Sequence, residues 1–248
     1  MNPNNKKRNK ILTIIVLLSF LFFCTALGYN IINNKKSKAL GDTIAIGDLN
    51  RPVTDAKQEG RDLRNELLNI KSNYNDAVAW LKVPGTSIDD TIFQSNDNQK
   101  YLKTSRDGKK TKWGEPFMDY RCDSTNITNA GNYIIYGHNT EKDDNFTPLL
   151  NYKRKDFFDK HKTIELATIN GDYKFDIFSV YSTDTNFYYI DTSFNSIDDY
   201  KNFENSLKAK SIYDTGVTLS ENDSILTLST CDYSLKDGRF VIQAKMEK

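Results

Sequence analysis

The chain has 248 residues, of which 38% are hydrophobic and 27% are charged, an ordinary balance for a globular domain with its own core. Residues 1–38 hold seven Lys or Arg and no acid, which leaves 27 basic and 33 acidic side chains in the remainder, a net charge of −6. A mildly acidic body argues against nucleic acid as a partner, because binding to a phosphate backbone needs a broad basic face.

An apolar segment near the N-terminus has the length of a transmembrane helix. Residues 11–27 carry no charge, and residues 28–32 extend the stretch to about the 20 residues that cross a bilayer. Four basic residues precede it, which predicts a cytoplasmic N-terminus and an exported body. We therefore expect a cytoplasmic tail over 1–10, a single-pass signal-anchor in the cell membrane over 11–32, a linker over 33–54 and an extracytoplasmic domain over 55–248.

A cleaved signal peptide is the alternative interpretation of this segment. No small-x-small cleavage site follows the apolar run. Residues 21–24 resemble a lipoprotein box, but Phe23 is bulky for the position before the cysteine. The sequence therefore favours an anchor that stays uncleaved.

The body begins with a helical pattern and continues with short strands. Residues 55–72 place apolar side chains at near-helical spacing, which predicts an amphipathic helix. Short apolar or alternating runs bounded by turn residues then predict strands. These strands are expected at residues 79–83, 88–94, 133–136, 163–168, 174–182, 224–230 and 239–245. Many short strands at close spacing are typical of a mainly β fold, either an antiparallel barrel or a sandwich.

One further helix is expected late in the chain, between the strands at 174–182 and 224–230. Ser196 followed three residues later by Asp199 has the form of a helix N-cap with an acid in the first turn. Tyr200, Phe203 and Leu207 then follow on one face.

The cysteines are Cys24, Cys122 and Cys231. Cys24 lies in the apolar segment, and one remaining pair makes no disulfide framework in a body of this size. Cys231 follows an apolar strand, where a thiol is held rigidly and can act as a nucleophile. A small buried residue is the alternative interpretation of Cys231. Cys122 is the competing nucleophile, but its polar, loop-like surroundings favour a bystander.

The chain has two histidines, His138 and His161. His138 follows the strand at 133–136 and Gly137, at a strand end where the backbone can approach a substrate. His161 lies in a charged stretch that we expect to be solvated surface. His138 is therefore the candidate proton-transfer group, with a structural turn histidine as the alternative.

Arg239 opens the last strand, eight residues after Cys231. If residues 224–230 and 239–245 pair as a hairpin, the guanidinium lies across the connecting loop from the thiol and can donate to an oxyanion. A surface arginine is the alternative. The chain lacks the closely spaced Cys/His pairs of a zinc site and the Gly-x-Ser-x-Gly of a serine hydrolase.

These residues resemble the signature of the sortase family of cysteine transpeptidases. Residues 227–231 read Thr-Leu-Ser-Thr-Cys and match the family pattern Thr-Leu-x-Thr-Cys, with Arg239 a short loop later and His138 at a strand end upstream. The resemblance covers about residues 75–246. It is strongest to class B, whose members carry a helical segment before the barrel and a helix inserted between the sixth and seventh strands.

The resemblance implies a closed eight-stranded β-barrel with a substrate groove at one face. Cys231 would be the nucleophile, His138 the proton-transfer partner and Arg239 the cation on the oxyanion side. Substrate-binding positions are implied at Asn98, Leu102, Tyr136, Thr185, Tyr189, Ile190 and Ser229. No metal and no organic cofactor is implied.

The implied reaction cleaves a C-terminal cell-wall sorting signal after Thr through a thioester. The protein would then be transferred to an amino group of a peptidoglycan precursor. Partners would be surface proteins that bear the signal, the precursor amine, and the cytoplasmic membrane through the anchor. The sorting motif stays open between Asn-Pro-x-Thr-Asn-like and Leu-Pro-x-Thr-Gly-like signals. The alternatives are a cysteine peptidase that hydrolyses a similar peptide and a non-catalytic surface protein that binds peptide.

Overall fold

The structure is a computed structural model that describes residues 62–248. The expected tail, signal-anchor and linker lie outside the described residues, as does the beginning of the helix expected at 55–72. Within residues 62–248, no helix is both long enough and apolar enough to cross a membrane.

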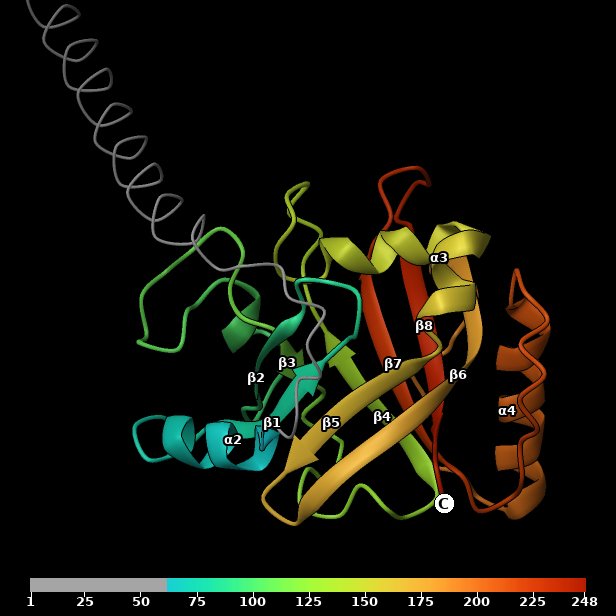
Figure 1. The fold of residues 1–248 in the computed structure, drawn as a ribbon, viewed down its shortest axis with the longest axis horizontal. Helices are drawn as coiled ribbons and strands as arrows, with labels where there is room; N and C mark the ends of the chain where they lie inside the picture. Colours follow the sequence, from blue (N-terminus) through green and yellow to red (C-terminus); the bar gives the residue numbers. More distant parts are fainter. Residues whose placement is uncertain (1–61) are drawn as a thin grey trace, which may run out of the picture. The chain divides into compact units, whose positions relative to one another are not determined.

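Eight strands of the described region close into a β-barrel (Figure 1). They are β1 (Ala77–Lys82), β2 (Asp89–Phe93), β3 (Phe117–Met118), β4 (Gly131–Tyr136), β5 (Thr163–Thr168), β6 (Gly171–Thr183), β7 (Ser224–Cys231) and β8 (Arg239–Met246). Their order around the barrel is β1-β2-β3-β4-β7-β8-β6-β5. The pairs β2–β3 and β4–β7 are parallel, and the other pairs are antiparallel. The expected mainly β, closed eight-stranded barrel is confirmed.

The barrel interior is filled by large apolar side chains, because strands of a closed sheet present alternate residues to the inside. Fully buried examples are Leu81, Ile92, Phe175, Leu228 and Ile242. β7 is buried along its length except at its last residue. A strand that is covered on both faces and paired on both edges is a rigid support for whatever lies at its end.

The helical elements are α2 (Leu63–Lys71), η1 (Lys100–Leu102), η2 (Thr147–Lys153), α3 (Lys155–Lys160) and α4 (Ile197–Lys210). The helix expected at 55–72 is confirmed over its described part, where Asp62 caps α2 by accepting from the Asn65 amide. The short elements η1, β3, η2 and α3 were not expected. They are too brief to show a helical or strand period in the sequence.

The expected late helix is confirmed as α4, which lies between β6 and β7. Ser196 is its N-cap, and the Ser196 hydroxyl accepts from the Asp199 amide at 3.1 Å. Tyr200, Phe203 and Leu207 pack against the outer face of the barrel. Figure 1 shows α4 standing beside β6 and β8. The chain between β6 and α4 is thereby held against the barrel.

α4 also buries one carboxyl group. Glu204 is 2% exposed, and its Oε1 has no hydrogen-bond partner within residues 62–248. Burial, together with the nearby Asp223 carboxylate, raises the pKa of Glu204 from 4.5 to about 7. Because the folded-state pKa lies above the unfolded value, the neutral form stabilises the fold at acidic pH. That contribution is lost as the pH rises through the folded-state pKa.

Replacing Glu204 with Gln keeps the shape of the side chain and removes the ionisation. We expect Glu204→Gln to raise the free energy of unfolding at pH 8 by about 1–3 kcal/mol, with little difference near pH 4. Urea unfolding at several pH values measures this. Glu221→Gln is the control, because the Lys201 ion pair lowers the pKa of Glu221 and its pH effect should have the opposite sign. An equal gain at pH 4 and pH 8 for Glu204→Gln would contradict the assignment.

Candidate active site

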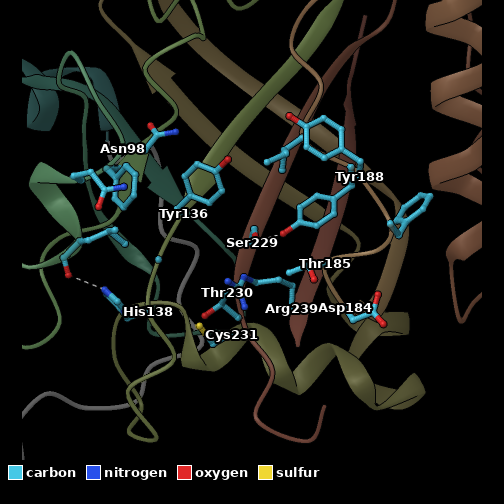
Figure 2. A pocket seen from close by; sticks show the side chains of 17 residues that line it. Asn98, Tyr136, His138, Asp184, Thr185, Tyr188, Ser229, Thr230, Cys231 and Arg239 are labelled. Carbon is cyan, nitrogen blue, oxygen red and sulfur yellow. Dashed lines mark hydrogen bonds between the residues drawn. The ribbon is translucent and has the colours of Figure 1, made fainter. Parts of the chain in front are cut away.

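A groove of about 420 Å³ opens where β4 and β7 end and β8 begins (Figure 2). One wall comes from the segment around η1, which follows β2. The opposite wall comes from residues 184–190, which connect β6 to α4. Both walls lie beside the strand ends, so a peptide bound between them would run over the last residues of β7.

Cys231 is the last residue of β7, and Arg239 is the first residue of β8. The two strands pair in antiparallel register with Cys231 opposite Arg239. The hairpin expected from the sequence is therefore confirmed. The Cys231 side chain is partly exposed and forms no disulfide. A thiol in this position is fixed by the ladder and open to the groove.

The Arg239 guanidinium lies beside the thiol and is only partly engaged by the protein. Its Nη1 donates to the Gly238 carbonyl at 2.9 Å and to the Asp237 carbonyl at 3.3 Å. Nε and Nη2 donate to no acceptor within residues 62–248, so both nitrogens are available to a ligand oxygen in the groove that Arg239 lines. Figure 2 shows Cys231 between His138 and Arg239.

His138 reaches the groove because β4 runs parallel to β7. Tyr136 pairs with Ser229, and the Gly137 amide continues the ladder by donating to the Ser229 carbonyl at 3.1 Å. A Cβ added at Gly137 would overlap the Phe146 ring, so only glycine fits this close approach. The next residue along the chain, His138, is thus placed beside the end of β7.

The His138 imidazole has two neighbours in the structure. Its Nε2 lies 2.8 Å from the Leu102 carbonyl oxygen, which is the dashed contact in Figure 2. Its ring meets the Trp113 ring edge-on, with 5.7 Å between centroids. Both neighbours come from the chain between β2 and β3, which therefore sets the orientation of the imidazole.

A buried carboxylate anchors the loop that follows the cysteine. Asp232 is 3% exposed and accepts from Lys153 Nζ at 2.7 Å, Ser182 Oγ at 2.6 Å and Ser234 Oγ at 2.7 Å. Burial opposes ionisation, but these donors outweigh it and hold the pKa of Asp232 well below its ordinary range. The loop between β7 and β8 is therefore fixed next to the thiol.

Two further hydrogen bonds join this loop to the histidine segment. Asn139 Nδ2 donates to the Cys231 carbonyl at 3.1 Å, and the Tyr233 hydroxyl donates to the Asn139 carbonyl at 2.8 Å. The side chains next to His138 and Cys231 thus tie each segment to the backbone of the other. The separation between the imidazole and the thiol is set by the backbone as well as by side-chain rotamers.

Asp119 links the two walls of the groove. Its carboxylate is fully buried and accepts from Asn98 Nδ2 at 2.9 Å and from the Tyr136 hydroxyl at 2.9 Å. Arg121 Nη2 donates to the same carboxylate at 2.7 Å and to the Ile190 carbonyl at 3.0 Å. Burial opposes the ionisation of Asp119, but the donors around it outweigh that effect and lower its pKa.

The wall formed by residues 184–190 is also tied to the barrel strands. The Tyr189 side chain is 7% exposed, and its hydroxyl lies 2.8 Å from Ser229 Oγ. Asn132 Nδ2, from β4, donates to the carbonyls of Tyr189 at 3.1 Å and Asp191 at 2.9 Å. The wall formed by residues 184–190 is therefore an ordered surface that hydrogen bonds hold against β4 and β7.

The structure places all ten sequence-predicted site residues on the lining of this groove. They are Asn98, Leu102, Tyr136, His138, Thr185, Tyr189, Ile190, Ser229, Cys231 and Arg239. Sequence reasoning missed Trp113, Asp119, Arg121 and Asp232, which support the lining residues. An acid two residues before an arginine, or directly after a cysteine, is too common a pattern to identify such supports.

The competing cysteine and the second histidine lie elsewhere. Cys122 is buried in the barrel core, and its Sγ accepts from the Ile134 amide at 3.4 Å. Burial raises the pKa of the Cys122 thiol to about 12, which keeps it protonated. The stretch around His161 is surface, as expected, with Lys160 and Lys162 exposed. The His161 ring itself is half-buried and packs on Phe157, with 4.4 Å between centroids.

Comparison with known proteins agrees with this geometry. A sequence model described as Sortase domain matches residues 81–247. Sortase B of Listeria monocytogenes is 38% identical over 240 residues, covering 96% of this chain and 96% of that protein. Sortase B of Staphylococcus aureus is 34% identical over 188 residues, covering 75% and 76%.

Solved structures give the same result. A Staphylococcus aureus sortase B-substrate complex matches with a TM-score of 0.69 at 34% identity, covering 75% of this chain and 86% of that chain. Clostridium perfringens sortase B matches with a TM-score of 0.69 at 32% identity, covering 73% and 99%. Together with a free thiol in a peptide-sized groove, these matches define a cysteine transpeptidase. The chain belongs to the sortase family, and the relatives that it matches are class B sortases.

Arg121 offers a test of how the walls are held. Arg121→Lys keeps a positive charge near Asp119, but an ammonium lacks the planar fork that bridges to the Ile190 carbonyl. We expect the KM for a sorting-signal peptide to rise about tenfold, because losing a charged hydrogen bond costs about 1.5–3 kcal/mol, while kcat changes less. Steady-state kinetics measure both constants. Arg154→Lys, on the surface before α3, is the control, and an unchanged KM in Arg121→Lys would contradict the bridge.

Proposed function

We propose that this enzyme cleaves a sorting-signal peptide after Thr at Cys231 and transfers the acyl group to an amine of a peptidoglycan precursor. The observation that carries the proposal is the pairing of Cys231 with Arg239 at the two ends of the loop that joins β7 to β8, beside His138. Family membership supports the coarser role of a cell-wall transpeptidase. The residue roles and the details of the substrate are our inference.

In the first step the Cys231 thiolate attacks the Thr carbonyl carbon, and a carbon–sulfur bond forms. The carbonyl oxygen becomes an oxyanion, to which Nε and Nη2 of Arg239 donate. Donors placed in this way are typically worth about 100- to 1,000-fold in rate. Collapse of the intermediate breaks the peptide bond, and protonated His138 delivers a proton to the leaving amine. A thioester on Cys231 remains.

In the second step the acceptor amine attacks the thioester carbonyl, and His138 accepts a proton from that amine. The carbon–sulfur bond breaks, an amide bond forms, and the thiolate is regenerated. His138 must turn from the Leu102 carbonyl toward the thiol for this chemistry. Catalytic hydrogen bonds commonly reach their final alignment only when a substrate binds. No metal or organic cofactor enters either step.

The neighbouring family members support both substrates of this scheme. One solved relative is described as a sortase B-substrate complex, and another as sortase B complexed with triglycine. A peptide with a free amine is the chemical class that the second step consumes. We further infer that residues 11–32 anchor the enzyme in the cell membrane, with residues 55–248 exported as the catalytic domain.

The two free cysteines of residues 62–248 provide a matched pair of variants. We expect Cys231→Ala to abolish cleavage of a sorting-signal peptide and Cys122→Ala to leave turnover within about twofold, because only Cys231 is an accessible nucleophile. Fluorogenic peptide cleavage measures the first step. Mass analysis of the product with and without triglycine separates amide transfer from hydrolysis. Loss of activity in Cys122→Ala alone, with a folded protein, would contradict the assignment.

A further inference from the structure

A basic hairpin, residues 103–112, stands beside the groove. It contains five Lys or Arg and one acid, whereas the chain beyond residue 38 has a net charge of −6. Figure 1 shows this loop in green, extending away from the barrel near β2 and β3. The remaining body is acidic on balance, although residues 153–162 hold a second group of five Lys or Arg with two acids.

The basic hairpin has a defined backbone. Thr104 and Lys110 form an antiparallel bridge, and the Ser105 amide donates to the Lys109 carbonyl at 2.9 Å. Gly108 occupies the tip with a φ of +78°, a conformation that favours glycine. The cationic side chains are thus carried on an ordered turn.

One cation of the basic hairpin is used to hold it in place. Arg106 Nη2 lies 2.9 Å from Glu115 Oε2 and 3.2 Å from Asp90 Oδ1. Glu115 is 9% exposed, so this ion pair lies at the base of the hairpin, against the barrel. Arg106 therefore fixes the hairpin and is not available to a ligand.

The four lysines of the basic hairpin are exposed instead. Lys109 contacts Asp107 at 2.6 Å, but both side chains are exposed, and such a pair contributes little. Lys112 lies 4.3 Å above the Trp113 ring. Lys103 and Lys110 have no anionic partner within residues 62–248. Neighbouring ammonium groups raise the local potential, which attracts a multiply charged anion.

The two residues that flank the basic hairpin contact His138. Leu102, directly before it, offers the carbonyl to His138 Nε2, and Trp113, directly after it, packs on the imidazole. A ligand bound to the lysines would lie on the His138 side of the groove. In the proposed function, that is the side where amines leave and arrive.

We propose that the basic hairpin binds phosphate carried by the amine acceptor and thereby recruits the second substrate to His138. The proposal deepens the proposed function and depends on it. Lysine ammonium groups are point charges that suit phosphate oxygens. A compact anionic group fits this local patch better than an extended anionic bilayer, because the rest of the body is acidic and would be repelled by a negative surface.

The test uses the full-length chain and two acceptors that share the same triglycine amine. One acceptor ends in a flexible linker with a diphosphate ester, and the other ends in a hydroxyl. We expect the unaltered enzyme to favour the diphosphate acceptor by about tenfold in kcat/KM at low salt, with the preference falling as salt screens the charges. Lys109→Gln with Lys110→Gln should remove this preference, and Lys109→Glu with Lys110→Glu should reverse it.

Two controls make the result specific. Lys160→Gln with Lys174→Gln removes the same charge from exposed positions outside the groove lining and should keep the preference. The rate of thioester formation, measured as peptide cleavage in the absence of acceptor, should stay within about twofold of the unaltered enzyme in every variant.

Equal use of both acceptors by the unaltered enzyme would overturn the proposal while leaving the proposed function intact, because amide product still forms. The lysine variants could instead form less amide product with both acceptors, and only in vesicles that contain phosphatidylglycerol. That result would identify a membrane contact and would also overturn the proposal. Absence of amide product with either acceptor would refute the proposed function itself.

Discussion

The pairing of β7 with β8 is the constraint on which the active site depends. The ladder puts Cys231 opposite Arg239, and the parallel pairing of β7 with β4 puts His138 beside the same strand end. In a closed barrel a strand cannot slide without breaking pairs on both edges, so the register is fixed by all eight strands together. Residues far apart in the chain thus converge on one groove, and loops alone do not have to position them.

Two buried carboxylates fix the segments around the groove that the strand pairing does not hold. Asp119 joins the two walls, and Asp232 fixes the loop behind the thiol, yet neither lines the groove. Both have lowered pKa values, so their contribution to stability is present above the unfolded pKa and is lost as the pH falls. Glu204 acts with the opposite sign, because its pKa is raised by burial. The stability of the domain is therefore lowered both at acidic pH and at alkaline pH.

The sequence allowed the catalytic end of the barrel to be predicted more fully than its supports. Residues 224–230 and 239–245 are apolar strand patterns with a cysteine and an arginine at their junction, so the hairpin and the two candidate residues at its loop could be predicted. The segment from η1 to β3 could not be predicted from the sequence. β3 has two residues and η1 has three, and neither length shows a period. Trp113 and Asp119 therefore had no signal, because their roles arise from tertiary contacts with His138, Asn98 and Tyr136.

In the proposed mechanism Cys231, His138 and Arg239 act on one carbonyl group. The most direct measurement is a crystal structure of the enzyme with a sorting-signal analogue bound covalently to Cys231. We expect the analogue's oxygen to accept from the Arg239 guanidinium and His138 to have turned from the Leu102 carbonyl toward the sulfur. An adduct whose oxygen points away from Arg239, with His138 still bonded to Leu102, would contradict it.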